Sequence, residues 1–235
     1  MLTVLGFAPF YLFPVPVITL ALLFGFCHNS TTPLKAALMG FGFGMGLFSA
    51  GVTWIYVSLH DFGAMPMPLA VTALIILCAY LAIFPALSVW ILAKLRLTSS
   101  ISWALVAAAL WMLFEWLRGS LFTGFPWLAL GYSQAPYSPL VGFAPIVGVY
   151  GISLLLVLSA TLLFLWIDKG VRKWRYGLPL MLIWLTGSCL HMIDWVKPHG
   201  EPITVSLLQG NIAQDMKWRE DHVENTMETY AKLIL

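Results

Sequence analysis

Long apolar stretches alternate with short polar segments along most of this chain. Lys, Arg, Asp and Glu are absent from residues 1–34, 36–60, 62–93, 97–114, 119–167 and 176–193. A helix needs about 20 apolar residues to cross roughly 30 Å of hydrocarbon, so each stretch has room for one crossing. Prolines interrupt the first and fifth stretches and shorten the spans within them. The pattern predicts an all-α transmembrane bundle of six helices, over about 13–28, 37–58, 68–93, 101–118, 143–167 and 177–195.

Composition supports a membrane protein and excludes several other classes. Of the 235 residues, 60% are apolar and only 9% are charged, whereas a soluble domain carries about 25% charge. The apolar content excludes a disordered chain, and a net charge of +2 argues against a nucleic-acid binder. Three cysteines are too few for a disulfide-stapled secreted domain.

The basic residues predict the orientation of the bundle. Between the first and second, third and fourth, and fifth and sixth spans lie seven of them: Lys35, Lys94, Arg96, Lys169, Arg172, Lys173 and Arg175. The opposite side, up to Gly200, holds only Arg118 and Lys197. Because cytoplasmic loops are enriched in Lys and Arg, the seven-residue side is expected to be cytoplasmic. The loops 59–67 and 119–142 and the chain after about 196 then face outside.

The chain changes character after Pro198, which predicts a domain boundary between 1–198 and 199–235. ITVSLLQGNI, residues 203–212, is typical of a buried strand. Residues 219–235 have the apolar spacing of an amphipathic helix. A strand followed by a helix is the opening of an α/β domain, but one of each cannot bury a core. We therefore expect that this segment packs on something else or that the sequence is a fragment.

Few residues in the spans are suited to chemistry. The cysteines, which are expected to be buried and inert, are Cys27, Cys78 and Cys189. His191, Asp194 and His199 lie close in sequence, but their spacing matches no strong metal pattern, which favours a hydrated interfacial cluster. Neither a metal nor a cofactor is expected.

Two further features within the spans each allow a structural and a functional interpretation. Gly40/Gly44 and Gly42/Gly46 form overlapping GxxxG pairs, which favour close helix packing, with a groove for an acyl chain as the alternative. Glu115 and Arg118 are three residues apart and share a helix face. They are interpreted either as a structural ion pair or, for Arg118, as a contact to a lipid phosphate.

The segment TGFPWLALGYSQAPYSP, residues 123–139, is long, aromatic and uncharged. Long loops without secondary structure are usually functional or disordered, and the aromatic content argues against disorder. The loop is predicted to meet a lipid or a lipidated substrate at the outer membrane surface. The alternative is a re-entrant plug that only seals the bundle.

Several segments together resemble the N-terminal part of the apolipoprotein N-acyltransferase family. They are FAPF (7–10), GFGFGMGLFSAGVTWIYVSLHDFGAMP (40–66), EWLRGSLFTGFPWLALGYSQ (115–134), APIVGVYGIS (144–153) and VSLLQGNIAQDMKW (205–218). They cover nearly the whole chain in the family's order. The resemblance implies a monomeric multi-pass protein of the bacterial inner membrane, with eight helices and a periplasmic nitrilase-like domain between the seventh and eighth.

The same resemblance implies an acyl transfer from a phospholipid to the α-amine of a lipoprotein's N-terminal diacylglyceryl cysteine. The family uses a Cys thioester, a Glu base and a Lys that stabilises the oxyanion. The six predicted spans align with the family's second to seventh helices. The family's catalytic residues would follow Leu235, so no residue here is assigned a catalytic role and the chain alone is expected to be inactive.

The resemblance places a few residues beside the substrate site. Trp218 matches a tryptophan at the family's active-site entrance, with an anchor between domain and bilayer as the alternative. Trp127, with Gly124, Phe125 and Pro126, matches the membrane-surface loop beneath the nitrilase-like domain, and Arg118 is grouped with them. Two other functions remain open, a non-catalytic lipid-binding membrane scaffold and a small transporter. The near absence of ionisable residues within the spans counts against the transporter.

Overall fold

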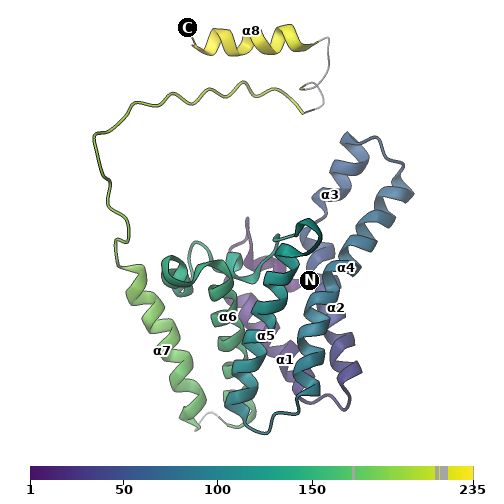
Figure 1. Ribbon diagram of the computed structural model, residues 1–235, viewed down its shortest axis with the longest axis vertical. Coiled ribbons are helices and arrows are strands. Elements are labelled where there is room, and N and C mark those ends of the chain that lie inside the picture. The colour runs from purple at the N-terminus through teal and green to yellow at the C-terminus, as the bar shows by residue number, and fades with distance from the viewer. Residues whose placement is uncertain (171–172, 215–216, 218–221, 235) are drawn as a thin grey trace.

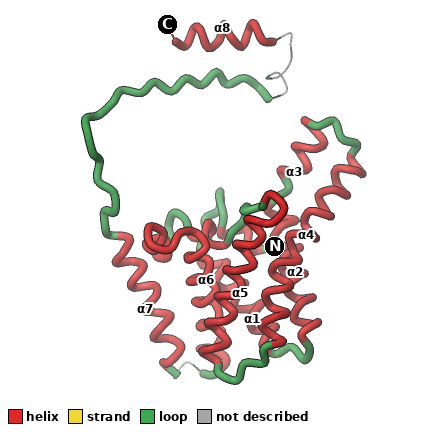
Figure 2. Tube along the Cα trace, in the orientation of Figure 1, coloured by secondary structure: helices red, strands yellow, loops and turns green. Residues whose placement is uncertain are grey.

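The computed structural model describes residues 1–235 except 171–172, 215–216, 218–221 and 235. Its main helices are α1 (Pro14–His28), α2 (Pro33–Gly51), α4 (Met67–Lys94), α5 (Ser100–Ser120), α6 (Ala144–Asp168), α7 (Trp174–His191) and α8 (Val223–Ile234). Shorter helical segments are η1 (Leu2–Gly6), α3 (Trp54–Val57), η2 (Ser58–Phe62), η3 (Leu121–Thr123), η4 (Leu130–Gln134) and η5 (Pro139–Phe143). No strand occurs among the described residues, so this part of the chain is all-helical (Figure 2).

The helices α1, α2, α4, α5, α6 and α7 run up and down in one bundle (Figure 1). The turns after α1, α4 and α6 therefore lie together at one end, close to the basic residues of the sequence. The N-terminal segment η1, the connection from α5 to α6 and the chain after α7 lie toward the other end. The loops that are rich in Lys and Arg thus lie at the same end of the bundle.

Four helical segments are long and apolar enough to cross a membrane: Pro33–Gly51, Met67–Lys94, Ser100–Thr123 and Pro139–Asp168. Pro14–His28 is apolar but shorter, and α7 has 18 residues. Each of the six stretches predicted as a span contains a helix. The chain is thus a multi-pass membrane protein, while the count of six crossings and the domain boundary at 198 stay predictions.

The glycines of α2 allow this helix to pack closely against α4. A Cβ at Gly40 would lie 2.6 Å from the Val89 side chain, and one at Gly44 would lie 2.8 Å from the Ala82 backbone. The packing interpretation of this GxxxG pair is therefore confirmed, and no room for an acyl chain remains at these two positions. Gly42 faces open space instead, and Gly46 approaches the N-terminal residue.

The second predicted span, 37–58, is interrupted. The helix α2 ends at Gly51, and α3 with the π-helical turn η2 follows after Val52. A Cβ at Gly51 would lie 2.3 Å from the Leu128 side chain. The break therefore lies where the loop between α5 and α6 packs over the end of α2. The segment with α3, together with the start of α4, projects beyond the bundle (Figure 1).

The strand predicted over 203–212 does not form in this structure. The segment is extended coil, and its apolar side chains are exposed, with Ile203 at 85% and Leu207 at 92%. A strand needs a neighbouring strand for its backbone hydrogen bonds, and no partner strand occurs among the described residues. The predicted helix is present as α8, which leaves its apolar residues Met227 and Ile234 exposed. The fold class predicted for 199–235 is thus found only in its helical part.

Candidate functional site

The loop between α5 and α6 closes the end of the bundle opposite the basic turns (Figure 1). It was expected to lack secondary structure, but η3, η4 and η5 make it compact. Leu130 and Gln134 are buried, whereas Trp127 and Tyr137 remain exposed. The loop therefore seals the bundle and presents an aromatic outer face, while its contact with a lipid or lipidated substrate stays a prediction.

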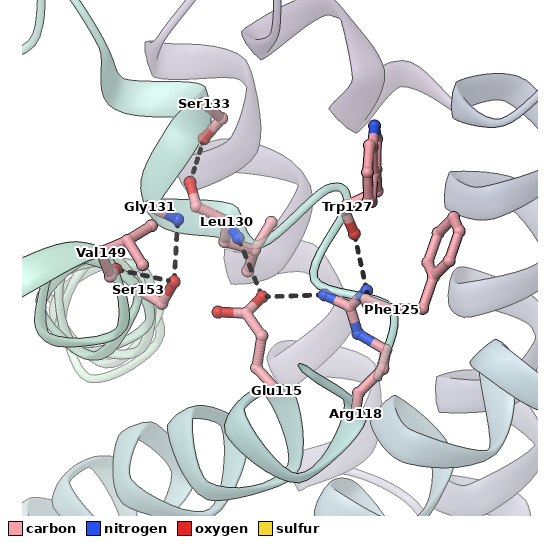
Figure 3. Close-up of polar contacts among 9 residues, drawn as sticks. All are labelled: Glu115, Arg118, Phe125, Trp127, Leu130, Gly131, Ser133, Val149 and Ser153. Atoms are coloured by element: carbon pink, nitrogen blue, oxygen red, sulfur yellow. Dashed lines mark hydrogen bonds and ion pairs between the residues drawn. The ribbon is translucent and has the colours of Figure 1, made fainter. Parts of the chain in front are cut away.

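Arg118 holds the start of this loop from below (Figure 3). Its Nη1 donates hydrogen bonds to the carbonyl oxygens of Phe125 at 2.7 Å and Trp127 at 2.6 Å. The guanidinium also lies over the Phe48 ring, 5.1 Å from its centroid. Arg118 is only 2% exposed, so it is a buried structural group and does not extend to a lipid phosphate.

Glu115 holds the next part of the same loop. Its Oε1 accepts a hydrogen bond from the backbone N–H of Leu130 at 2.8 Å and lies 3.9 Å from Nη2 of Arg118. One turn apart on α5, the two charges face each other and contact the loop on either side of Leu128. A buried charge must be paired and hydrogen-bonded to be tolerated, and Oε1 of Glu115 and the Arg118 guanidinium meet both conditions.

Helix α6 and the N-terminal segment provide further anchors. The Ser153 hydroxyl accepts a hydrogen bond from the N–H of Gly131 at 2.8 Å and donates to the carbonyl of Val149 at 3.3 Å (Figure 3). The Gln134 amide donates to the carbonyl of Phe13 at 3.2 Å. Gly124 has a φ of +77°, and a Cβ there would lie 2.0 Å from the carbonyl oxygen of Gly119. Glycine is therefore required where the loop turns back over α5.

An aromatic pocket lies between the outer face of the loop and the N-terminal segment. Its volume is about 620 Å³, and its walls are formed by Phe7, Ala8, Tyr11, Pro126, Trp127, Leu128, Tyr132, Ala135 and Pro136. Trp127 packs against Trp54 and Phe125, with ring centroids 5.9 and 5.4 Å away. Ligand sites commonly have volumes of roughly 300–1,000 Å³ and mostly apolar walls. This pocket has both properties.

Most of the residues selected from the sequence come together here. Gly124, Phe125, Pro126 and Trp127 lie in the loop, and Arg118 lies beneath it. Trp218 lies outside the described residues. Whether any of these residues contacts a substrate stays a prediction.

The other residues considered for chemistry lie apart from the pocket. Cys27 and Cys78 are buried as expected, but Cys189 is exposed on α7, so the expectation of burial was wrong for this cysteine. His191, Asp194 and His199 are exposed, and within the described ranges no three His, Cys, Asp or Glu residues gather as a metal site would require.

Sequence reasoning did not assign Phe7 and Tyr11 to the pocket or Ser153 to the loop anchors. The motif FAPF contains Phe7, but the family resemblance that it supports does not indicate what Phe7 contacts. Its contact with a loop more than 100 residues away depends on how the helices pack. Ser153 lacked a local signal, because a single serine within an apolar helix usually bonds to its own backbone.

These features define a polytopic helical membrane protein in which a buried Glu–Arg pair holds an aromatic loop at one end of the bundle. Residues 1–162 match the family described as apolipoprotein N-acyltransferase N-terminal domain. The chain belongs to the apolipoprotein N-acyltransferase family.

Relatives from several bacteria carry the same family name. The chain is 62% identical over 232 residues to an apolipoprotein N-acyltransferase of Nitrosomonas europaea, covering 99% of this chain and 46% of that protein. Similar proteins of Methylococcus capsulatus (42% over 232 residues; 97% and 45% covered) and Chromobacterium violaceum (39% over 234 residues; 99% and 45% covered) carry this name too. The chain thus spans about half the length of the curated relatives it matches.

Proposed function

We propose that this chain forms the membrane part of an enzyme that transfers an acyl chain from a phospholipid to the α-amine of a lipoprotein's N-terminal diacylglyceryl cysteine. The family membership supports the reaction class. We assign the lipid site to the aromatic pocket at the loop, because its walls are mostly apolar and can bind an acyl chain. On this proposal the pocket end of the bundle faces the periplasm across the bacterial inner membrane.

We assign the bond-making chemistry to a region other than the bundle. A nucleophile needs a base within hydrogen-bond reach, but Cys27 is buried and its thiol contacts the backbone carbonyl of Ala36, at 4.0 Å. Cys78 is buried among apolar residues as well. The extended segment 203–212 and α8, with their exposed apolar side chains, are assigned to the start of a nitrilase-like domain that would supply the thioester cysteine, the base and the oxyanion-stabilising lysine.

Photo-crosslinking tests the lipid assignment directly. A phospholipid with a diazirine in its acyl chain is incorporated into vesicles that contain the protein, and the labelled peptides are identified by mass spectrometry. The peptide with Trp127 and Tyr132 should be labelled, and Trp127→Ala should reduce its labelling severalfold. Trp116→Ala is the matched control, because Trp116 is similarly exposed, at 49% against 53%, but does not line the pocket.

Equal labelling of the pocket in wild type and Trp127→Ala would contradict the proposed site. In a protein that contains this chain and has the full length of its relatives, Trp127→Ala should also lower acyl transfer. Labelling of the pocket without any acyl transfer by that longer protein would instead favour the non-catalytic lipid-binding scaffold.

A further inference from the structure

Two buried oxygen atoms near the ion pair make no hydrogen bond of good geometry to the described residues, although the side chains of Ser153 and Trp111 approach the Glu115 carboxyl. They are Oε2 of Glu115 on α5 and Oγ of Ser88 on α4. Glu115 is 6% exposed and Ser88 is 2% exposed. Leaving a buried polar group without a partner costs about 1–3 kcal/mol, and more when the group is charged. Two such atoms on facing helices therefore indicate a missing partner.

A small cavity lies between these two helices and includes both residues in its wall. Its volume is about 20 Å³, and Phe48, Trp111, Arg118 and Leu128 are among the other residues that line it. A water molecule needs roughly 10–15 Å³ of such space and two to four polar partners. The cavity is large enough for one water molecule and too small for a lipid chain.

We propose that one ordered water molecule occupies this cavity and completes the polar network beneath the loop. It donates one hydrogen bond to Oε2 of Glu115 and exchanges a second with the hydroxyl of Ser88. Arg118, in the same wall, already balances the carboxylate charge, so a neutral ligand fits this cavity better than a metal ion. In a membrane-embedded bundle, lipid cannot satisfy these atoms and an internal water can.

The water connects Ser88 of α4 to Glu115, which itself holds the loop through the N–H of Leu130. Leu128 lines this cavity on one side and the aromatic pocket on the other. Its neighbour Trp127 is held through its carbonyl by Arg118. The position of the pocket wall thus depends on how tightly the small cavity is filled. This inference does not rest on the proposed function, because water occupancy is measurable without any acyl transfer.

Hydroxyl-radical footprinting of the intact protein in detergent tests the inference, since radicals formed from a bound water label the side chains around it. Phe48 and Phe24 are matched reporters, because both are buried, at 2% and 0% exposure, and only Phe48 lines the cavity. We expect Phe48 to be labelled severalfold faster than Phe24. Equal, slow labelling of the two rings would overturn the proposal.

A substitution that fills the cavity provides the second test. Ser88→Val removes the hydroxyl and adds volume, so labelling of Phe48 should fall to the level of Phe24. Ser188→Val is the control, because the Ser188 hydroxyl is bonded to the Trp184 carbonyl of its own helix and should leave labelling unchanged. Labelling of Phe48 that persists in folded Ser88→Val would show that the radicals come from elsewhere. If Ser88→Val does not fold, the comparison of Phe48 with Phe24 in the unmodified protein decides alone.

Discussion

The guanidinium of Arg118 donates a hydrogen bond to the backbone carbonyl of Trp127 at 2.6 Å, nine residues further along the chain. A buried charge thereby holds the backbone of an exposed aromatic residue while its ring stays free to form the pocket wall. Because the contact is made to the backbone, it fixes the loop whatever side chain occupies position 127. The role of Arg118 in holding the loop and the role of the Trp127 ring in the pocket wall can therefore be tested separately.

Removing the charge of Arg118 should destabilise the protein. Arg118→Met leaves the Glu115 carboxylate buried without its cation, and breaking a buried pair in this way costs about 3–5 kcal/mol. Thermal unfolding in detergent should show a clearly lower midpoint. Arg96→Met, at an exposed position near the other end of the bundle, is the control and should change the midpoint little. An unchanged midpoint in Arg118→Met would mean that the loop does not depend on this contact.

The α2 glycines should respond differently to the same substitution. Gly44→Ala places a Cβ 2.8 Å from the Ala82 backbone, and such overpacking typically costs about 1–3 kcal/mol. Gly42→Ala meets open space and should be neutral or stabilise the helix by about 0.5–1 kcal/mol. Unfolding measurements on the two variants test the α2–α4 interface. Equal effects would contradict the packing described for Gly44.

The orientation across the membrane is accessible to cysteine labelling. In a variant without the native cysteines, a membrane-impermeant thiol reagent added from the periplasmic side should react at Tyr137→Cys and not at Lys169→Cys. Both positions are exposed, and they lie before and directly after α6, on the two sides of this helix along the chain. The expectation comes from the unequal distribution of Lys and Arg between the two sides. Reaction at position 169 alone would reverse the orientation.

Residues 1–235 by themselves should transfer no acyl chain from phospholipid to a diacylglyceryl peptide. Enzymes lower such barriers by about 8 kcal/mol or more, and among the described residues the thiol of Cys27 bonds to a backbone carbonyl and not to a basic side chain. Turnover by the purified chain, measured by mass spectrometry of the peptide, would disprove this expectation. Cys27→Ala, Cys78→Ala and Cys189→Ala would then identify the cysteine responsible.

The sequence was enough to predict the membrane class, the approximate positions of the main helices and the family. These follow from the spacing of charges and prolines and from local motifs, because a helix in lipid must satisfy its own backbone and be apolar over its length. The GxxxG pairs likewise indicated close packing. Only the fold, however, showed that Gly40 and Gly44 face α4 while Gly42 does not.

How the candidate site is built became visible only in the packed structure. The spacing of Glu115 and Arg118 predicted that they share a face, but whether that face pointed to lipid or to protein depended on the path of a loop up to fifteen residues away. The strand predicted over 203–212 lacks a partner strand here, since strand pairing is non-local and cannot be read from one segment. The pocket joins Phe7 to Trp127, and only helix packing brings two such distant segments together.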